Sequence, residues 1–232
     1  MEITANTFDS EFFGRAIAKC VAVPGEFESV EIDKMENLQS WDLLAVESRS
    51  AQPGLEDYCV GELIELQGSL QTMRSTLLSI DARFSTASLC DENWSEVRRL
   101  QQYAGQTRFS VDPHFTADEV INHKLKMLRI YQQAEPELAL YISVEGRFQG
   151  FQVSNFADQM LNFYEVIVDP EHGGSFITLD LFRDVLGRAL TLRPDCTKVG
   201  TKIYAGNRRS LGFFKRMGMK EVGKKYFYHL WA

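Results

Sequence analysis

Several features that would assign a chain to a large class of proteins are missing from this sequence. Aspartate and glutamate (32) outnumber lysine and arginine (25), so the net charge is −7 and no basic excess exists to neutralise nucleic-acid phosphates. No apolar run approaches the roughly 20 residues of a membrane-spanning helix. The opening Met1-Glu2-Ile3-Thr4 shows neither a basic segment nor the apolar stretch of a signal peptide. We therefore expect a cytoplasmic protein without a nucleic-acid or membrane partner.

Cysteine is also scarce. The four cysteines, Cys20, Cys59, Cys90 and Cys196, lie far apart, and no C-x-x-C pair occurs. This spacing argues against a metal site, and this density argues against a disulfide framework. We expect four buried, reduced thiols and no bound metal.

The composition and length indicate an ordinary globular protein. Hydrophobic residues make up 44% and charged residues 25%, values typical of soluble domains, and 232 residues suffice for a sizeable core. The polar stretch 86–93 is the best candidate linker. It predicts a small α/β domain over 1–85 and a second domain over 86–232.

Hydrophobic periodicity predicts the order of elements. In the first part we expect strands over 17–23, 42–48 and 76–82, a short helix near 32–40, and an apolar segment, 63–70, that fits either a helix or a strand. In the second part we expect helices over 94–104 and 117–135, the latter capped by Thr116. We further expect antiparallel strands over 138–145, 149–156 and 160–168, a helix over 178–192, a strand over 198–204, a helix after Asn207 and a closing strand over 224–231.

The most informative stretch is 207–219, which reads N-x-x-S-x-x-F-F-x-x-M-G-M. Asn207 is a good N-cap and Gly218 a good left-handed residue after the helix. The stretch resembles the signature N-x-x-A-x-x-L-Y-x-x-x-G-F of the GCN5-related N-acetyltransferases (GNATs). The expected element order is also that of the GNAT fold, a mixed, mostly antiparallel sheet flanked by helices. Here it would be preceded by a small α/β domain.

Two further motifs narrow the resemblance. The segment Phe8–Arg15 is similar to the opening D-S-x-F-F-G motif of bacterial dTDP-fucosamine acetyltransferases. Gln106-Thr107-Arg108-Phe109, followed by Asp112-Pro113, is similar to an S-R-F segment of that group. The resemblance implies transfer of an acetyl group from acetyl-CoA to the amine of a nucleotide-linked 4-amino-4,6-dideoxyhexose.

The resemblance also implies a place for the cofactor. In the family, the strand equivalent to 160–168 pairs with the pantetheine arm through its main chain, and the next loop, R/Q-x-x-G-x-G/A, holds the pyrophosphate. Gly174 matches the first glycine, but Phe176 and Thr178 stand at the next two small positions, where a side chain hinders close approach. A plain strand-to-helix turn therefore remains an alternative. The implied cofactor contacts are Val166, Ile167, Val168, Gly173, Gly174, Ser175, Phe176, Thr178 and Asn207.

One letter of the signature helix departs from the family. Phe214 stands where the family tyrosine protonates the leaving thiolate, and a phenyl ring has no proton to donate. Water is one alternative, since a thiolate is a good leaving group. The candidate side chains are Tyr204, Tyr226 and Tyr228, on strands that flank this helix.

The base and the acceptor residues are also expectations. Glu165 is the candidate base, with the loop residues His114 and His172 as alternatives. Strand alternation predicts that Glu165 shares a face with its second neighbours on each side, whereas Tyr164 lies on the opposite face. Arg108 is the best candidate for the diphosphate of a nucleotide sugar, since a guanidinium pairs well with phosphate, and it is grouped with Phe109 and His114.

Two readings from different classes stay open. Intact acceptor-side motifs favour an active amino-sugar N-acetyltransferase. The changes at Phe176 and Phe214 favour a degenerate GNAT fold that serves as a binding or regulatory module, or an acyltransferase with another acyl donor or a small amine acceptor. A homodimer is left open.

Overall fold

The computed structural model describes residues 2–24, 40–172 and 176–232, and its strands form one sheet of ten. The strand order is β1-β2-β3-β10-β4-β9-β8-β7-β6-β5. The strands are β1 (Ile3–Ala5), β2 (Ile17–Ala22), β3 (Leu43–Ser48), β4 (Cys59–Ser69), β5 (Ala87–Ser88), β6 (Ala139–Val144), β7 (Arg147–Ala157), β8 (Met160–Val168), β9 (Lys198–Tyr204) and β10 (Lys220–Trp231).

Six α-helices and four 3-10 turns accompany this sheet in the described ranges. The helices are α1 (Thr7–Phe13), α2 (Leu70–Leu78), α3 (Trp94–Gln101), α4 (Ala117–Ala134), α5 (Phe176–Leu192) and α6 (Arg208–Arg216). The 3-10 turns are η3 (Glu56–Tyr58), η4 (Asp91–Asn93), η5 (Pro136–Leu138) and η6 (Pro170–His172). None of these helices is long and apolar enough to cross a membrane.

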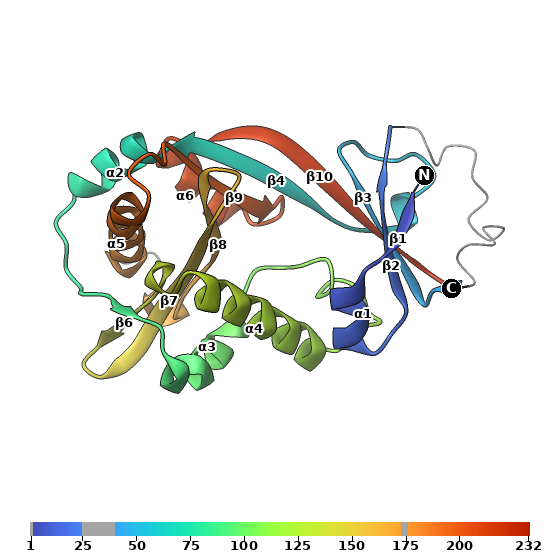
Figure 1. Cartoon of the computed structure of the whole chain (residues 1–232), viewed down its shortest axis with the longest axis horizontal. Helices are drawn as coiled ribbons and strands as arrows, with labels where there is room; N and C mark the ends of the chain where they lie inside the picture. Colours follow the sequence, from blue (N-terminus) through green and yellow to red (C-terminus); the bar gives the residue numbers. More distant parts are fainter. Residues whose placement is uncertain (1, 25–39, 173–175) are drawn as a thin grey trace.

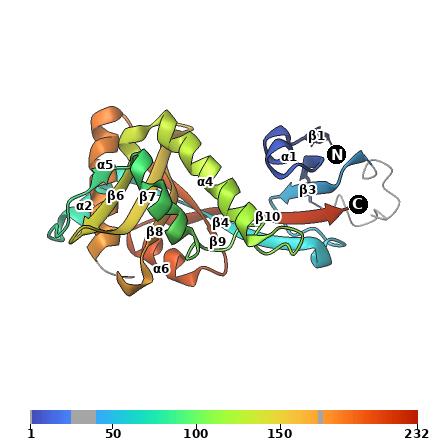
Figure 2. The ribbon, with the colours of Figure 1, turned by 90° about the horizontal axis from the view of Figure 1, so that it is seen from below.

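The molecule is elongated because two long strands connect a large part to a small one. Strands β4 to β9 and helices α2 to α6 make up the larger part, which we call the body (Figure 1). Strands β1 to β3 and helix α1 make up the smaller part, which we call the N-terminal module. Strand β10 belongs to both, since Lys220–Tyr228 pairs with β4 and its last six residues pair with β3. Figure 2 shows the two parts at opposite ends, bridged by β10.

Helices cover both faces of the body sheet. Leu181, Phe182 and Val185 of α5 pack with Phe214 of α6 on one face, in the largest core. On the other face, Val97 and Leu100 of α3 pack with residues of α4 and β7. Two faces buried by amphipathic helices explain the apolar strands of the body.

The caps that the sequence predicts are confirmed for two helices. Thr116 accepts a hydrogen bond from the Glu119 amide, and the Glu119 carboxylate accepts one from the Thr116 amide, so α4 begins at Ala117. Asn207 accepts a hydrogen bond from the Ser210 amide at 3.1 Å and caps α6. Gly218 follows with φ +86°, a conformation that favours glycine.

Three expectations for the first part of the chain have different outcomes in the structure. The predicted strand over 76–82 is wrong, because 70–78 is helix α2, whose Leu70, Met73 and Leu77 are buried at helical spacing after the cap Ser69. The ambiguous segment 63–70 is mainly strand, in β4. The helix near 32–40 falls almost wholly outside the described residues.

The predicted division at residue 85 stays a prediction. Strand β4 and helix α2 precede that boundary, yet β4 pairs with β9 and β10, and α2 packs against α5. Among the cysteines, Cys20 and Cys196 are buried as expected, whereas the prediction is wrong for Cys59 and Cys90, which are exposed.

Candidate functional site

The body sheet opens between β8 and β9. These parallel strands are paired only from Met160 to Phe163 on β8 and from Lys198 to Thr201 on β9. In the part of the chain that the structure describes, residues 164–168 and 202–204 continue without pairing to each other. We call this opening the split. It leaves main-chain hydrogen-bonding groups along one edge of β8, while the other edge stays paired with β7.

A β-bulge lies at the point where the split begins. Val153 of β7 is opposite Glu165 and Ser154 is opposite Phe163, so Tyr164 is the extra residue of β8. A bulge interrupts strand alternation and re-aims side chains. The predicted shared face of Phe163 and Glu165 is therefore wrong: Phe163 packs in the core of α5 and α6, whereas Glu165 pairs with α4.

The bulge turns two functional side chains toward α4. The Glu165 Oε2 atom lies 2.6 Å from Lys124 Nζ, and both side chains are largely buried. The Tyr164 ring lies 4.4 Å from the Tyr131 ring, centroid to centroid. Burial, together with Tyr131 and Glu165, raises the pKa of Tyr164, so its phenol stays protonated at neutral pH. Tyr164 and Lys124 could not be identified as site residues from the sequence, because strand alternation alone carries no signal of a bulge.

On β9, Tyr204 lies where that strand ends beside the split. Its ring packs against the main chain of Gly61 in β4, and a Cβ atom at Gly61 would overlap its Cε1 atom. Burial raises the pKa of Tyr204, and the nearby Arg108 charge opposes this rise. Tyr204 and Gly61 line a hollow of about 270 Å³ with Gln106 and Val111 of the loop after α3.

We expect Gly61→Ala to lower the free energy of unfolding by about 1–3 kcal/mol, because the added methyl group must displace the Tyr204 ring. Urea unfolding measures this change. The control is Gly187→Ala in α5, where a Cβ meets nothing within 4 Å. That variant should be more stable by about 0.5–1 kcal/mol, since alanine favours a helix. Equal stability of Gly61→Ala and the wild type would contradict the prediction.

Arg108 lies in the loop between α3 and α4 and is held by the N-terminal module. Its Nη2 atom donates to Asp9 Oδ2 at 2.8 Å, and its guanidinium lies over the Phe109 ring. Asp9 Oδ1 is also 2.8 Å from His123 Nε2 of α4. Burial raises the pKa of Asp9, but the hydrogen bond from His123 and the Arg108 charge outweigh it and leave the pKa below its usual value. Neither the Arg108 partner Asp9 nor the Asp9 partner His123 could be found from the sequence alone.

A second buried carboxylate, Asp112, holds the same loop on β10. Its Oδ2 atom lies 2.5 Å from His229 Nδ1 and 3.0 Å from Trp231 Nε1. Its Oδ1 atom accepts from the main-chain and ring nitrogens of His114, both at 2.9 Å, and the His114 ring stacks on Trp231. Phe109 is buried beside this cluster. The loop is thus fixed to the module by buried polar contacts.

The remaining predicted site residues are spread over several places. Phe214 is buried in the α5–α6 core against Phe163 and Phe182. Tyr226 packs in the core of the N-terminal module and is not brought to the split. Phe176 opens α5 with the Arg83 guanidinium 3.4 Å from its ring centroid.

The cofactor candidates divide between the split and its surroundings. Val166 and Val168 pack toward α5, and Ile167 packs toward α3. Thr178 lies in the first turn of α5. The segment 173–175, which holds Gly173, Gly174 and Ser175, lies outside the described residues. Asn207 caps α6 close to Gly105 of the loop after α3.

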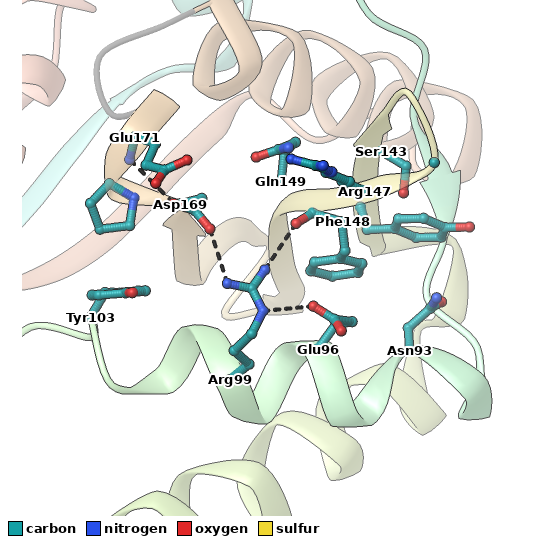
Figure 3. Close-up of a pocket in the computed structure, with 13 residues that line it drawn as sticks. Asn93, Glu96, Arg99, Tyr103, Ser143, Arg147, Phe148, Gln149, Asp169 and Glu171 are labelled. Atoms are coloured by element: carbon teal, nitrogen blue, oxygen red, sulfur yellow. Dashed lines mark hydrogen bonds and ion pairs between the residues drawn. The ribbon is translucent and has the colours of Figure 1, made fainter.

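A larger hollow of about 720 Å³ lies beside residues 169–171, which follow β8 (Figure 3). Side chains from α3, from the β6–β7 turn and from 169–171 line it. Arg99 of α3 points toward its centre and contacts Glu96, Asp169 and the Phe148 carbonyl. No group of three or more histidine, cysteine, aspartate or glutamate residues suited to a metal occurs within 2–24, 40–172 and 176–232.

The arrangement can be compared with known proteins. Neither a protein-family model nor a curated protein matches the sequence. Among solved structures, a functionally unknown conserved protein from Staphylococcus epidermidis aligns over 92% of this chain and 84% of its own, with a TM-score of 0.63 and 14% identity. A GCN5-related N-acetyltransferase from Kribbella flavida aligns over 91% and 80%, with a TM-score of 0.55 and 13% identity. Another from Sphaerobacter thermophilus aligns over 82% and 60%, with a TM-score of 0.51 and 14% identity.

The chain has the GNAT fold. This confirms the predicted fold class, a mixed and mostly antiparallel sheet flanked by helices. At 13–14% identity the likeness to these GNAT proteins establishes architecture and carries no substrate with it. Within the GNAT fold of this chain, the split is the place where unpaired main-chain groups of β8 lie beside ionisable side chains.

Proposed function

We propose that this chain is an acyl-CoA-dependent N-acyltransferase, with acetyl-CoA as the expected donor. The observation that carries the proposal is the split, whose unpaired β8 edge begins at the Tyr164 bulge. Main-chain groups of 166–168 would hold the pantetheine arm by adding it to that edge. Asn207 and the first turn of α5 are the proposed contacts for the rest of CoA. Acyl-CoA supplies the acyl group, activated as a thioester.

The chain offers a base and two hydrogen-bond donors for such chemistry. Glu165 is the proposed acceptor of the amine proton, and Lys124 holds its carboxylate in one orientation at 2.6 Å. Phe214 has no proton to donate. Tyr164 and Tyr204 are phenols whose pKa is raised from a value already well above neutral pH, so both carry a proton and are the proposed donors beside the split.

The proposed acceptor is the amine of a nucleotide-linked amino sugar. Support comes from the side chain of Arg108. Its hydrogen bond to Asp9 is made through Nη2, and the side chain is 26% exposed, so the guanidinium is accessible to a ligand. A guanidinium suits a diphosphate, and the surrounding sequence motifs resemble those of the amino-sugar enzymes. A small amine acceptor or another acyl donor is the runner-up, since Phe176 stands where the family loop has a small residue.

A binding or regulatory module is the alternative from a different class. The burial of Phe214 in an aromatic cluster favours this alternative. With phenylalanine at that position, α6 offers no tyrosine hydroxyl that could serve as the acid. Such a module would bind CoA without turnover, or bind no CoA at all. The two classes therefore separate in the assays that test the proposed enzyme.

We expect both acetyl-CoA and free CoA to raise Tm, since a ligand that binds only the folded state stabilises it. At 100 times Kd the expected rise is about 5–10 °C for a chain of this size. Differential scanning fluorimetry measures it, with adenosine as the control ligand that lacks the pantetheine arm. No rise at millimolar CoA would exclude the donor proposed here. Thiol release with dTDP- and UDP-linked amino sugars then tests the acceptor.

A further inference from the structure

Asp9 is a buried carboxylate of the N-terminal module that contacts two parts of the body. It is 4% exposed and lies in the first turn of α1. Its Oδ2 atom accepts a hydrogen bond from Arg108 Nη2 at 2.8 Å, and its Oδ1 atom lies 2.8 Å from His123 Nε2. Asn6, the cap of α1, also donates to Oδ2 at 2.5 Å. Both carboxylate oxygens are therefore engaged, so the side chain is held in one orientation.

His123 anchors this carboxylate on α4. Because an ionised carboxylate only accepts hydrogen bonds, His123 Nε2 carries the proton of its contact with Asp9. The His123 ring packs against the rings of Phe8, Phe12 and Phe13 of α1, with 5.1–5.4 Å between centroids. These contacts fix the imidazole, so Asp9 is fixed relative to α4 as well as to α1.

Arg108 uses only part of its hydrogen-bonding capacity on Asp9. In the part of the chain that the structure describes, its Nε and Nη1 atoms make no hydrogen bond, and neither is a buried, unsatisfied atom. The guanidinium carbon lies 4.6 Å from the ring centroid of Phe109 and 5.6 Å from that of Phe227. One carboxylate and two aromatic rings therefore hold the guanidinium, while most of its N–H groups remain available for an anion.

The guanidinium also lies within reach of the phenols beside the split. Phe227 of β10 is opposite Gly61 of β4, and the Tyr204 ring packs on Gly61. The Arg108 charge acts on Tyr204 and on Tyr164 of the bulge, since it opposes the rise in the pKa of each phenol. An anion bound to Arg108 is therefore held close to the proposed site of transfer.

We propose that Asp9 is a positioning residue for the acceptor, which directs the Arg108 guanidinium toward the diphosphate of a nucleotide-linked amino sugar. His123 holds Asp9 in place for this task. The inference rests on the proposed function, because it takes that diphosphate as the ligand of Arg108. A side chain oriented before binding loses less conformational freedom when the ligand arrives. The N-terminal module thereby contributes to acceptor affinity through Asp9.

The test compares two substitutions that remove the same charge. D9N keeps an oxygen that accepts from Arg108, whereas D9A leaves no acceptor there. Any effect of the lost charge on a diphosphate is common to both, so a difference between them reports the orientation of Arg108. The probes are dTDP-glucose and UDP-glucose, which carry the diphosphate but no amine. Isothermal titration should show about tenfold weaker probe binding to D9A than to D9N, and equal CoA binding.

Two controls separate this role from a general loosening of the module. Arg15 also joins the module to α4, through Glu119 Oε1 at 3.1 Å, but among the described residues it makes no contact with Arg108. R15Q should therefore leave the affinity for the probe unchanged. In an R108Q background, D9A and D9N should bind the probe equally, because Asp9 acts through Arg108. In turnover, D9A should raise KM for the amino sugar and leave kcat near that of D9N.

A second pair of variants leaves Asp9 in place and covers the case in which D9A does not fold. H123L removes the donor to Asp9 Oδ1, and leucine suits the surrounding aromatic rings. H123Q keeps an N–H group of similar reach. H123L should bind the probe about threefold more weakly than H123Q.

The outcomes distinguish the inference from the function on which it rests. If the wild type binds a probe, equal affinities of D9A and D9N would overturn the inference alone. Where D9A does not fold, equal affinities of H123L and H123Q would do the same. If the wild type binds CoA but neither nucleotide sugar, the proposed acceptor fails, and the role of Asp9 fails with it.

Discussion

Asp112→Ala should lower the free energy of unfolding by about 3–5 kcal/mol, the largest stability effect expected of any substitution considered. Asp112 is 3% exposed and receives hydrogen bonds from His229, Trp231 and the loop itself. Its removal leaves the buried polar atoms of His229 and Trp231 without partners. Chemical denaturation measures the loss.

The control for this substitution is Asp118→Ala in the first turn of α4. The Asp118 side chain is 80% exposed and forms an ion pair with Arg98, so its loss should change the free energy of unfolding by about 0.5 kcal/mol or less. If Asp112→Ala proved no more destabilising than Asp118→Ala, the buried cluster would not hold the loop on β10.

The same cluster predicts a loss of stability in weak acid. Burial lowers the pKa of His229, so the unfolded state takes up this proton at a higher pH than the folded state. The contribution is complete above the ordinary histidine pKa of 6.5 and is lost as pH falls from there toward the folded value. Unfolding at pH 7.5 and 5.5 should show the loss, and His229→Asn should reduce it.

Glu165→Gln should lower turnover by about 10²- to 10⁴-fold, the effect expected when a general base is removed. The amide keeps the shape of the side chain but accepts no proton from the amine. Steady-state rates of thiol release measure the effect. The control is Glu221→Gln on β10, an exposed partner of Lys215, which should retain wild-type turnover.

A separate measurement distinguishes lost chemistry from lost structure. Glu165→Gln leaves Lys124 without its carboxylate partner in a largely buried place, so some loss of stability is expected. The affinity for CoA should nevertheless stay near that of the wild type, because the proposed donor contacts of β8 are main-chain groups. Wild-type turnover in Glu165→Gln would exclude Glu165 as the base.

Sequence reasoning predicted those parts of the site that depend on local signals. Asn207 and Gly218 bound α6, and Thr116 with Glu119 begins α4, because a cap is made by residues three or four positions apart. The candidate Arg108 was found from its motif. Its partner Asp9 was not, because 99 residues separate the two in the chain.

The face of Glu165 shows the same limit within one strand. Alternation places Glu165 with Phe163, whereas the Tyr164 bulge moves Glu165 to the α4 side. A bulge depends on how β8 pairs with β7, and that register is not written in either strand alone. Tyr164 and Lys124 therefore emerged as site residues only in the folded chain.

The sequence by itself determined the order of most elements and the caps of two helices, because periodicity and capping act over a few residues, whereas the GNAT fold followed from the resemblance of 207–219 to that family's signature. The tertiary structure alone decided that β4 inserts between β9 and β10, that the split begins at Tyr164, and that Arg99 ties α3 to the end of β8. Each of these depends on strand register or on contacts between distant segments. Such contacts form only when the whole sheet assembles.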